Sequence, residues 1–189
     1  MLCEHRGRAP LTPVVRPLPM TRLLVAVAAS MVLAACGCGG DFRSVAKDRA
    51  ELLSGFESYM SRAELMKQLA ERSDVSIVPD PNTRSPRDTR PPFEMITVEL
   101  SAFEHLNHKG SLHITLFNDR LLGMWFYPEH PETYLDALRA SGVILIEDQE
   151  VVTGNVVMRQ SKDYRERLYV AWEDKRLGDE SNRWIRCYA

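Results

Sequence analysis

Apolar and polar residues alternate along Ile96-Thr-Val-Glu-Leu100 and again along Leu112-His-Ile-Thr-Leu116. A period of two predicts β-strands with one buried face. The next stretch, Leu121 to Tyr127, is apolar nearly throughout, as expected of a central strand that is covered on both faces or that offers one face to a partner. We predict an antiparallel meander of strands at 95–104, 111–117 and 121–127. Its turns lie at Asn107–Gly110, where Gly110 supplies a positive φ, and at Asn118–Arg120.

Two helices are marked by their end signals. Ser61-Arg-Ala-Glu64 is a capping box, in which the serine hydroxyl and the glutamate carboxylate each accept from a free backbone N–H. It predicts a helix over 61–72. Pro131 opens a second helix, which Gly142 ends.

Two further helices are predicted from apolar residues at helical spacing. One runs from Phe42 to Phe56. The other lies at the C-terminus and starts near Asp179 or Ser181. Counted from Leu177, its other apolar side chains follow after seven, eight and eleven residues: Trp184, Ile185 and Tyr188.

The fold class that follows is α+β, an antiparallel β-meander covered by short helices. Further strand candidates lie at 143–146, 151–158 and 168–172. Leu116-Phe-Asn-Asp-Arg-Leu121 is similar to Ala171-Trp-Glu-Asp-Lys-Arg-Leu177, and each follows an alternating strand. This similarity leaves two interpretations open: two α-β units, or chance likeness of turn residues, which we favour.

A proline-rich segment at 79–92 separates the first helices from the meander. Its five prolines in fourteen residues disfavour both helix and sheet. A loop of this length is either a functional contact or a disordered insertion.

Composition places the chain among ordinary globular proteins. Its 189 residues fit one domain, and 44% of them are apolar, which excludes disorder as a whole. With 24 basic and 26 acidic residues the net charge is -2, so we expect no nucleic-acid partner.

The N-terminal residues have the features of a leader. Arg22 forms a short basic region, and Leu23 to Leu33 form an apolar stretch of 11 residues, too short to span a bilayer. Met20 is an alternative start. We predict a signal peptide over 1–35, a tether and N-terminal helix over 36–60, and a single α+β domain over 61–189.

The end of this leader, Leu33-Ala-Ala-Cys36, resembles the lipobox of bacterial lipoproteins. The resemblance implies cleavage before Cys36, a diacylglyceryl group on its thiol, and anchoring to the membrane of the cell envelope. Gly37 stands where inner-membrane lipoproteins usually carry Asp, which implies the outer membrane. A plain secretory signal or a buried apolar helix are the alternatives.

Lipidation of Cys36 would leave Cys38 and Cys187 in an oxidising compartment. They are predicted either to form a disulfide that ties the C-terminus down near the membrane, or to stay as two free thiols. The chain carries no C-x-x-C pair and no cysteine–histidine spacing typical of a metal site.

The capped helix and the meander, roughly Ser61 to Tyr127, resemble the small outer-membrane lipoproteins of the BamE (SmpA/OmlA) and beta-lactamase-inhibitor-like group. That group's helix motif appears here as Met60-Ser-Arg-Ala-Glu-Leu-Met-Lys-Gln-Leu-Ala70, with Met60 and Ala70 in place of the usual glycines. The resemblance implies a small lipid-anchored domain, but a shared architecture says little about partners.

Two function classes follow. The first is a non-catalytic lipoprotein that binds an envelope protein, with Met124, Trp125 and Tyr127 as contact candidates, because aromatic and Met-rich surfaces are typical of interfaces. The second is a periplasmic metal-binding or hydrolytic domain centred on His105, His108 and His113, whose imidazoles could converge from a turn and the next strand. The nucleophile, zincin and phosphate-loop motifs are absent from the sequence, so we expect neither an enzyme nor a cofactor. Oligomeric state does not follow from the sequence.

Overall fold

The α+β prediction is confirmed by the computed structural model, which describes residues 38, 40, 42–45, 48–79 and 87–189. The chain divides into two units, 1–39 and 40–189, and every element below belongs to the second. A seven-stranded sheet dominates this unit, and each of its strands runs antiparallel to its neighbours. Its strands, in spatial order, are β3 (Val75–Pro79), β4 (Met95–His105), β5 (His108–Phe117), β6 (Arg120–Pro128), β9 (Leu168–Asp174), β8 (Val156–Lys162) and β7 (Glu150–Thr153).

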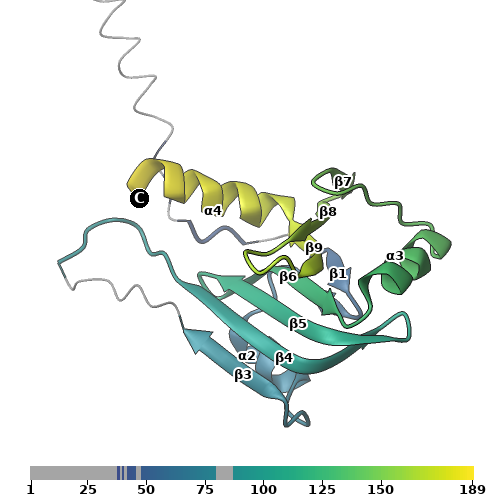
Figure 1. Cartoon of the computed structure of the whole chain (residues 1–189). Helices are drawn as coiled ribbons and strands as arrows, with labels where there is room; N and C mark the ends of the chain where they lie inside the picture. The colour runs from purple at the N-terminus through teal and green to yellow at the C-terminus, as the bar shows by residue number, and fades with distance from the viewer. Residues whose placement is uncertain (1–37, 39, 41, 46–47, 80–86) are drawn as a thin grey trace, which may run out of the picture. The chain divides into compact units, whose positions relative to one another are not determined.

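The predicted meander is confirmed as β4, β5 and β6, but its first turn differs (Figure 1). Leu106 and Asn107 make the turn, both with positive φ, and Gly110 lies within β5. A Cβ at Gly110 would lie 2.2 Å from the carbonyl oxygen of Tyr127. Close contact between two strands therefore explains Gly110, and its prediction as a turn residue is wrong. Strand β3 was not predicted.

Three helices are found in the described part of the chain: α2 (Arg62–Gln68), α3 (Pro131–Ala140) and α4 (Lys175–Tyr188). The capping box of α2 is confirmed, with Ser61 as N-cap and Glu64 accepting from its backbone N–H at 2.7 Å. Pro131 is the first residue of α3, as predicted. Helix α4 begins earlier than predicted, because the carboxylate of Asp174 accepts from the backbone N–H groups of Arg176 and Leu177.

The predicted N-terminal helix at 42–56 is wrong. Two short strands, β1 (Glu51–Leu53) and β2 (Phe56–Glu57), form a hairpin there. Ser54 and Gly55 both have positive φ, which suits a two-residue turn between paired strands. Leu52, Leu53 and Phe56 then enter the core from the hairpin rather than from a helix face.

The second half repeats the order of the first, which agrees with the less favoured of the two interpretations of the sequence, two α-β units. Helix α2 precedes β3–β5, and α3 precedes β7–β9. The predicted strand at 143–146 is absent from the described structure, where Ile144 and Ile146 are exposed, and 151–158 folds as the β7–β8 hairpin. After β5 a turn leads into β6, whereas after β9 Asp174 caps α4.

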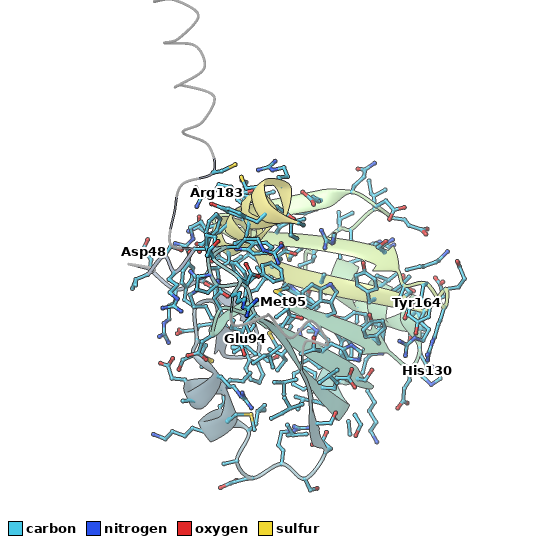
Figure 2. All side chains as sticks on the ribbon, turned by 90° about the vertical axis from the view of Figure 1, so that its left-hand side faces the viewer. Asp48, Glu94, Met95, His130, Tyr164 and Arg183 are labelled. Atoms are coloured by element: carbon cyan, nitrogen blue, oxygen red, sulfur yellow. The ribbon has the colours of Figure 1, made fainter. Side chains whose placement is uncertain are left out.

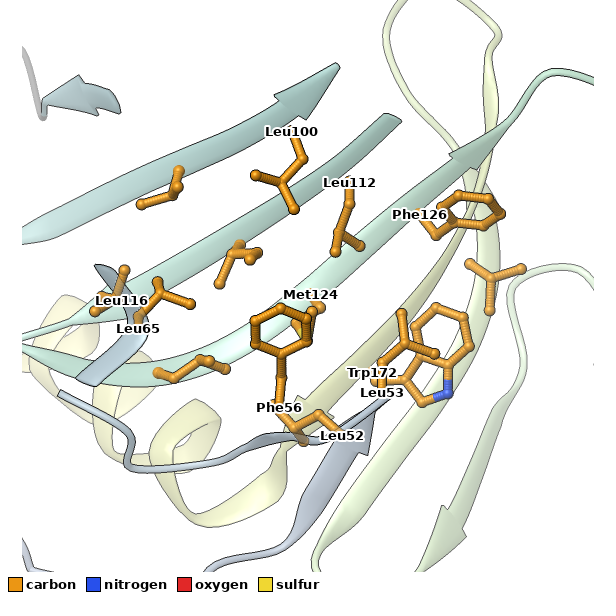
Figure 3. Packing of buried hydrophobic residues seen from close by; sticks show 14 of the residues in the cluster. Leu52, Leu53, Phe56, Leu65, Leu100, Leu112, Leu116, Met124, Phe126 and Trp172 are labelled. Carbon is orange, nitrogen blue, oxygen red and sulfur yellow. The ribbon is translucent and has the colours of Figure 1, made fainter. Parts of the chain in front are cut away.

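One face of the sheet carries the main core, shown in Figure 3. Helices α2 and α3 and the β1–β2 hairpin cover it. The members with no measurable exposure are Leu65, Val98, Leu100, Leu112, Ile114, Leu121, Met124, Phe126, Tyr134 and Val170. We call the face of the sheet that carries this core the covered face.

A second, smaller core lies under α4. It joins Phe42, Tyr59, Phe117, Leu122, Leu177 and Trp184. The described part of the proline-rich segment packs against the same helix, since Trp184 Nε1 donates to the carbonyl of Pro91 at 3.0 Å and Arg90 donates to that of Tyr188 at 2.7 Å. Residues 80–86 lie outside the described residues.

A buried ion pair fastens the N-terminal segment to α4. The guanidinium of Arg120 donates to Glu180 at 3.0 Å and to the carbonyl oxygens of Phe42 and Ser44 at 2.8 Å each. Ser44 also donates to Glu180.

Every buried side-chain N or O atom in the described residues has a partner. Among these residues, no helix combines the length and the apolar character that crossing a bilayer demands.

Candidate protein-binding surface

Alternate residues of the central strands point away from the main core and form what we call the open face. One row crosses the sheet as Glu99, His113, Trp125, Ala171 and Arg159, each the Cα partner of the next. A second row contains Ser111 beside Tyr127 and Tyr169 beside Ser161. Because adjacent strand residues face opposite sides, Trp125 and Tyr127 belong to this face while Met124 and Phe126 belong to the covered face.

Helix α4 covers one end of the open face and leaves the rest accessible. Met95 alternates with Thr97 and Glu99 along β4 and packs under α4 with Trp184. Gly178 of α4 lies against the side chain of Glu173 so closely that a Cβ would sit 2.2 Å from its carboxylate oxygen. Burial under the helix raises the pKa of Glu173.

Aromatic rings gather on the accessible part. The ring of Tyr127 lies 4.7 Å from that of His113 and 5.5 Å from that of Tyr169, measured between centroids. The guanidinium of Arg167 stacks over Tyr127 at 4.8 Å and pairs with Asp163 at 2.8 Å. Burial raises the pKa of Tyr127 and lowers that of His113, so both side chains are uncharged near neutral pH. Half-buried aromatic side chains beside a stacked arginine are the composition of interface hot spots.

A groove of about 640 Å³ continues from Tyr127 toward the start of α3. Its cations, Lys162 and Arg167, are paired with acids outside the groove. Its carboxylates have no ion-pair partner in the described structure: Glu129, Glu132 and Glu166. The groove therefore carries an excess of negative charge.

The three histidines do not converge on one site. His105 and His108 face each other across the β4–β5 turn, and His105 Nδ1 lies 2.8 Å from the hydroxyl of Tyr134. His113 lies on the open face, 3.9 Å from Glu99. Burial, with a smaller contribution from His108, lowers the pKa of His105. No group of three His, Cys, Asp or Glu side chains suited to a metal ion occurs in the described residues. The geometry for a metal site that the sequence suggested is therefore not present in these three residues.

The other predicted site residues have mixed outcomes. Met124 is fully buried in the main core, so its prediction as a contact residue is wrong. Cys36 lies outside the described residues. Cys38 and Cys187 are each disulfide-bonded, the state that a bridge between them requires, and their pairing stays a prediction.

Tyr169, Arg159 and Arg167 were missed. Leu168, Val170 and Trp172 alternate along the strand and therefore place Tyr169 on the opposite face. This alternation could have identified Tyr169 as a residue of the open face. What the sequence did not show is that β9 pairs with β6, so that Tyr169 lies beside Tyr127.

Neither the protein-family models nor the curated proteins contain a match to this chain.

Proposed function

We propose that this chain is a non-catalytic lipoprotein of the bacterial cell envelope, held in the outer membrane by acyl chains on Cys36, whose open face binds a protein partner. The observation that supports binding is the group of half-buried rings that two adjacent rows of the open face contribute, His113, Trp125, Tyr127 and Tyr169. Such rings offer large contact area and lose little side-chain freedom when a partner covers them.

The chemistry of this face suits recognition better than catalysis. Arg159 lies 3.5 Å from both Glu150 and Glu173, and Arg167 pairs with Asp163, so both arginines of this face already have partners within the domain. Paired groups of this kind orient a surface and set the charge pattern that a partner must match. The lipobox supports the anchor, and an envelope protein is the kind of partner available at that location.

The test is site-specific photocrosslinking in the native host. A photoreactive phenylalanine analogue replaces Tyr169 on the open face, or Lys67 on the exposed side of α2 as the matched control. We expect one dominant crosslinked envelope protein from position 169 and none from position 67. Equal crosslinking at both positions would contradict a binding role for the open face. Intact-mass analysis of the same membrane fraction tests the anchor, since it predicts loss of residues 1–35 and acyl chains on Cys36.

A further inference from the structure

The last turns of α4 present two cations that the domain does not neutralise. Arg183 and Arg186 are exposed and lie on successive turns of the helix. Neither has an ion-pair partner in the part of the chain that the structure describes; Arg183 stacks over the ring of Phe42 at 4.9 Å. Earlier in the same helix, by contrast, Lys175 pairs with Asp179 at 2.6 Å. Ile185, 45% exposed, directly precedes Arg186 in the sequence.

The length of the chain keeps this helix end close to the predicted anchor. Phe42 is buried in the core under α4, and Cys36 precedes it by six residues. At about 3.3–3.6 Å per extended residue, Cys36 lies within about 22 Å of Phe42. The acyl chains of Cys36 begin at the membrane surface, so the Phe42 end of the domain is near the lipid headgroups.

The predicted disulfide would bring the anchor closer still. Acylation of the Cys36 thiol and removal of the leader with Cys3 leave only two of the four cysteines, and both are disulfide-bonded. If Cys38 and Cys187 pair, Cys36 lies within about 14 Å of the Cα of Cys187, counting two extended residues and one bridge. Cys187 is the residue after Arg186.

We propose that Arg183 and Arg186 bind the phosphate groups of anionic lipids in the membrane that holds the anchor. This inference rests on the lipid anchor of the proposed function and adds a second, electrostatic contact to it. Basic residues next to a membrane anchor attract anionic headgroups. For two arginines the attraction corresponds to a preference of about 30-fold for an anionic over a neutral surface.

The contact would also orient the domain. Figure 2 shows Arg183 on the same side of the domain as Asp48, whereas Tyr164 and His130 lie at the opposite side. The groove beside Tyr127 is lined by residues that flank those two, Glu129, Pro131 and Glu166. With Arg183 and Arg186 on the membrane, this acidic groove points away from the anionic surface.

The test compares arginine reactivity in two kinds of vesicle. The leader-processed protein from the host membrane is reconstituted in phosphatidylcholine alone, or with about one third phosphatidylglycerol, and modified with phenylglyoxal. Peptide mass spectrometry then follows Arg183 and Arg186, with Arg62 and Arg165 as internal controls that are also exposed and without an ion pair among the described residues. We expect modification of Arg183 and Arg186 to slow at least fivefold in the anionic vesicles, with recovery in 0.5 M NaCl, while the controls do not change.

A variant pair gives a second measurement. Arg183→Gln/Arg186→Gln should lose the protection from hydrogen exchange that phosphatidylglycerol gives to the amides of 182–189, whereas Arg62→Gln/Arg165→Gln should retain it. Equal modification rates in the two vesicles would overturn the headgroup contact, whatever the mass on Cys36. A mass without acyl chains would overturn the anchor, and slower modification in anionic vesicles in that sample would still support the headgroup contact.

Discussion

The two faces of the seven-stranded sheet are built from the same strands and meet different surroundings. On β6, Phe126 has no measurable exposure and touches the rings of Phe103 and Tyr134, while its neighbours Trp125 and Tyr127 lie half-buried on the open face. The covered face is closed by two helices and a hairpin, whereas α4 closes only one end of the other.

The difference shows how stability and recognition can be divided along one strand. Burial of aliphatic and aromatic side chains on the covered face supplies most of the folding free energy. The open face keeps aromatic rings accessible, and Tyr127 contacts the rings of His113 and Tyr169 on that face. Substitutions on the two faces should therefore separate loss of folding from loss of binding.

The largest contrast is expected between two neighbours on β6. Phe126→Ala removes a fully buried ring and should lower the free energy of unfolding by about 3–5 kcal/mol. Trp125→Ala should cost less than half of that and should weaken crosslinking to the partner. Urea unfolding followed by circular dichroism measures both, and equal losses would show that the open face is also core.

The two ion pairs of α4 extend the comparison to charges. Arg120→Ala would leave Glu180 buried without its partner and should cost about 3–5 kcal/mol. Lys175→Ala removes the exposed ion pair with Asp179, one helix turn further along α4, and should lower the free energy of unfolding by about 0.3–0.5 kcal/mol. Thermal unfolding of both variants compares the two losses of stability. A small effect of Arg120→Ala would mean that the contacts of Arg120 with Glu180, Phe42 and Ser44 contribute little to stability.

Close packing between β5 and β6 gives an intermediate effect. Gly110→Ala places a methyl group against the carbonyl of Tyr127 and the ring of Phe126, and should cost about 1–3 kcal/mol. Ser111→Ala, one residue further, is the control, with an expected change within about 0.5 kcal/mol. Chemical denaturation compares the two. A neutral Gly110→Ala would mean that the strands can separate slightly at this point.

The smallest effect concerns the histidines of the two faces. Burial lowers the pKa of both His105 and His113, so the unfolded chain binds more protons than the folded one below about pH 7. Stability is therefore present above the unfolded pKa and is lost as pH falls through 6.5 toward the lowered folded values. Glu99→Gln should lower the pKa of His113 further, because it removes an attraction worth about 0.2–1 kcal/mol, and should not move that of His105. NMR titration of the imidazole protons measures the pKa of each histidine separately. An equal change in both pKa values would contradict the conclusion that the two histidines have separate environments.

Local signals in the sequence predicted much of this fold. The capping box at Ser61, Pro131 at a helix start and the alternation along β4 and β5 each act over a few residues, and each prediction was confirmed. Spacing failed between Phe42 and Phe56, because apolar residues at such intervals also suit a hairpin when Ser54 and Gly55 can adopt positive φ.

The site was only partly predictable. Trp125 and Tyr127 were predicted as contact residues from their types and lie on the open face, but Met124 was grouped with them although alternation places it on the other face. Tyr169 joins them through pairing between strands distant in sequence, which no local pattern specifies. The anchor and the predicted bridge stay predictions from the cysteines alone.

The attachment of Phe42 has a mechanical consequence. Its carbonyl oxygen accepts from Arg120 and from the amide of Asn118, both at the turn between two central strands. A pull on the chain from the N-terminal side would load these side-chain hydrogen bonds before it reached β1. Residues 42–45 would then detach from the domain first, while the sheet itself stayed intact.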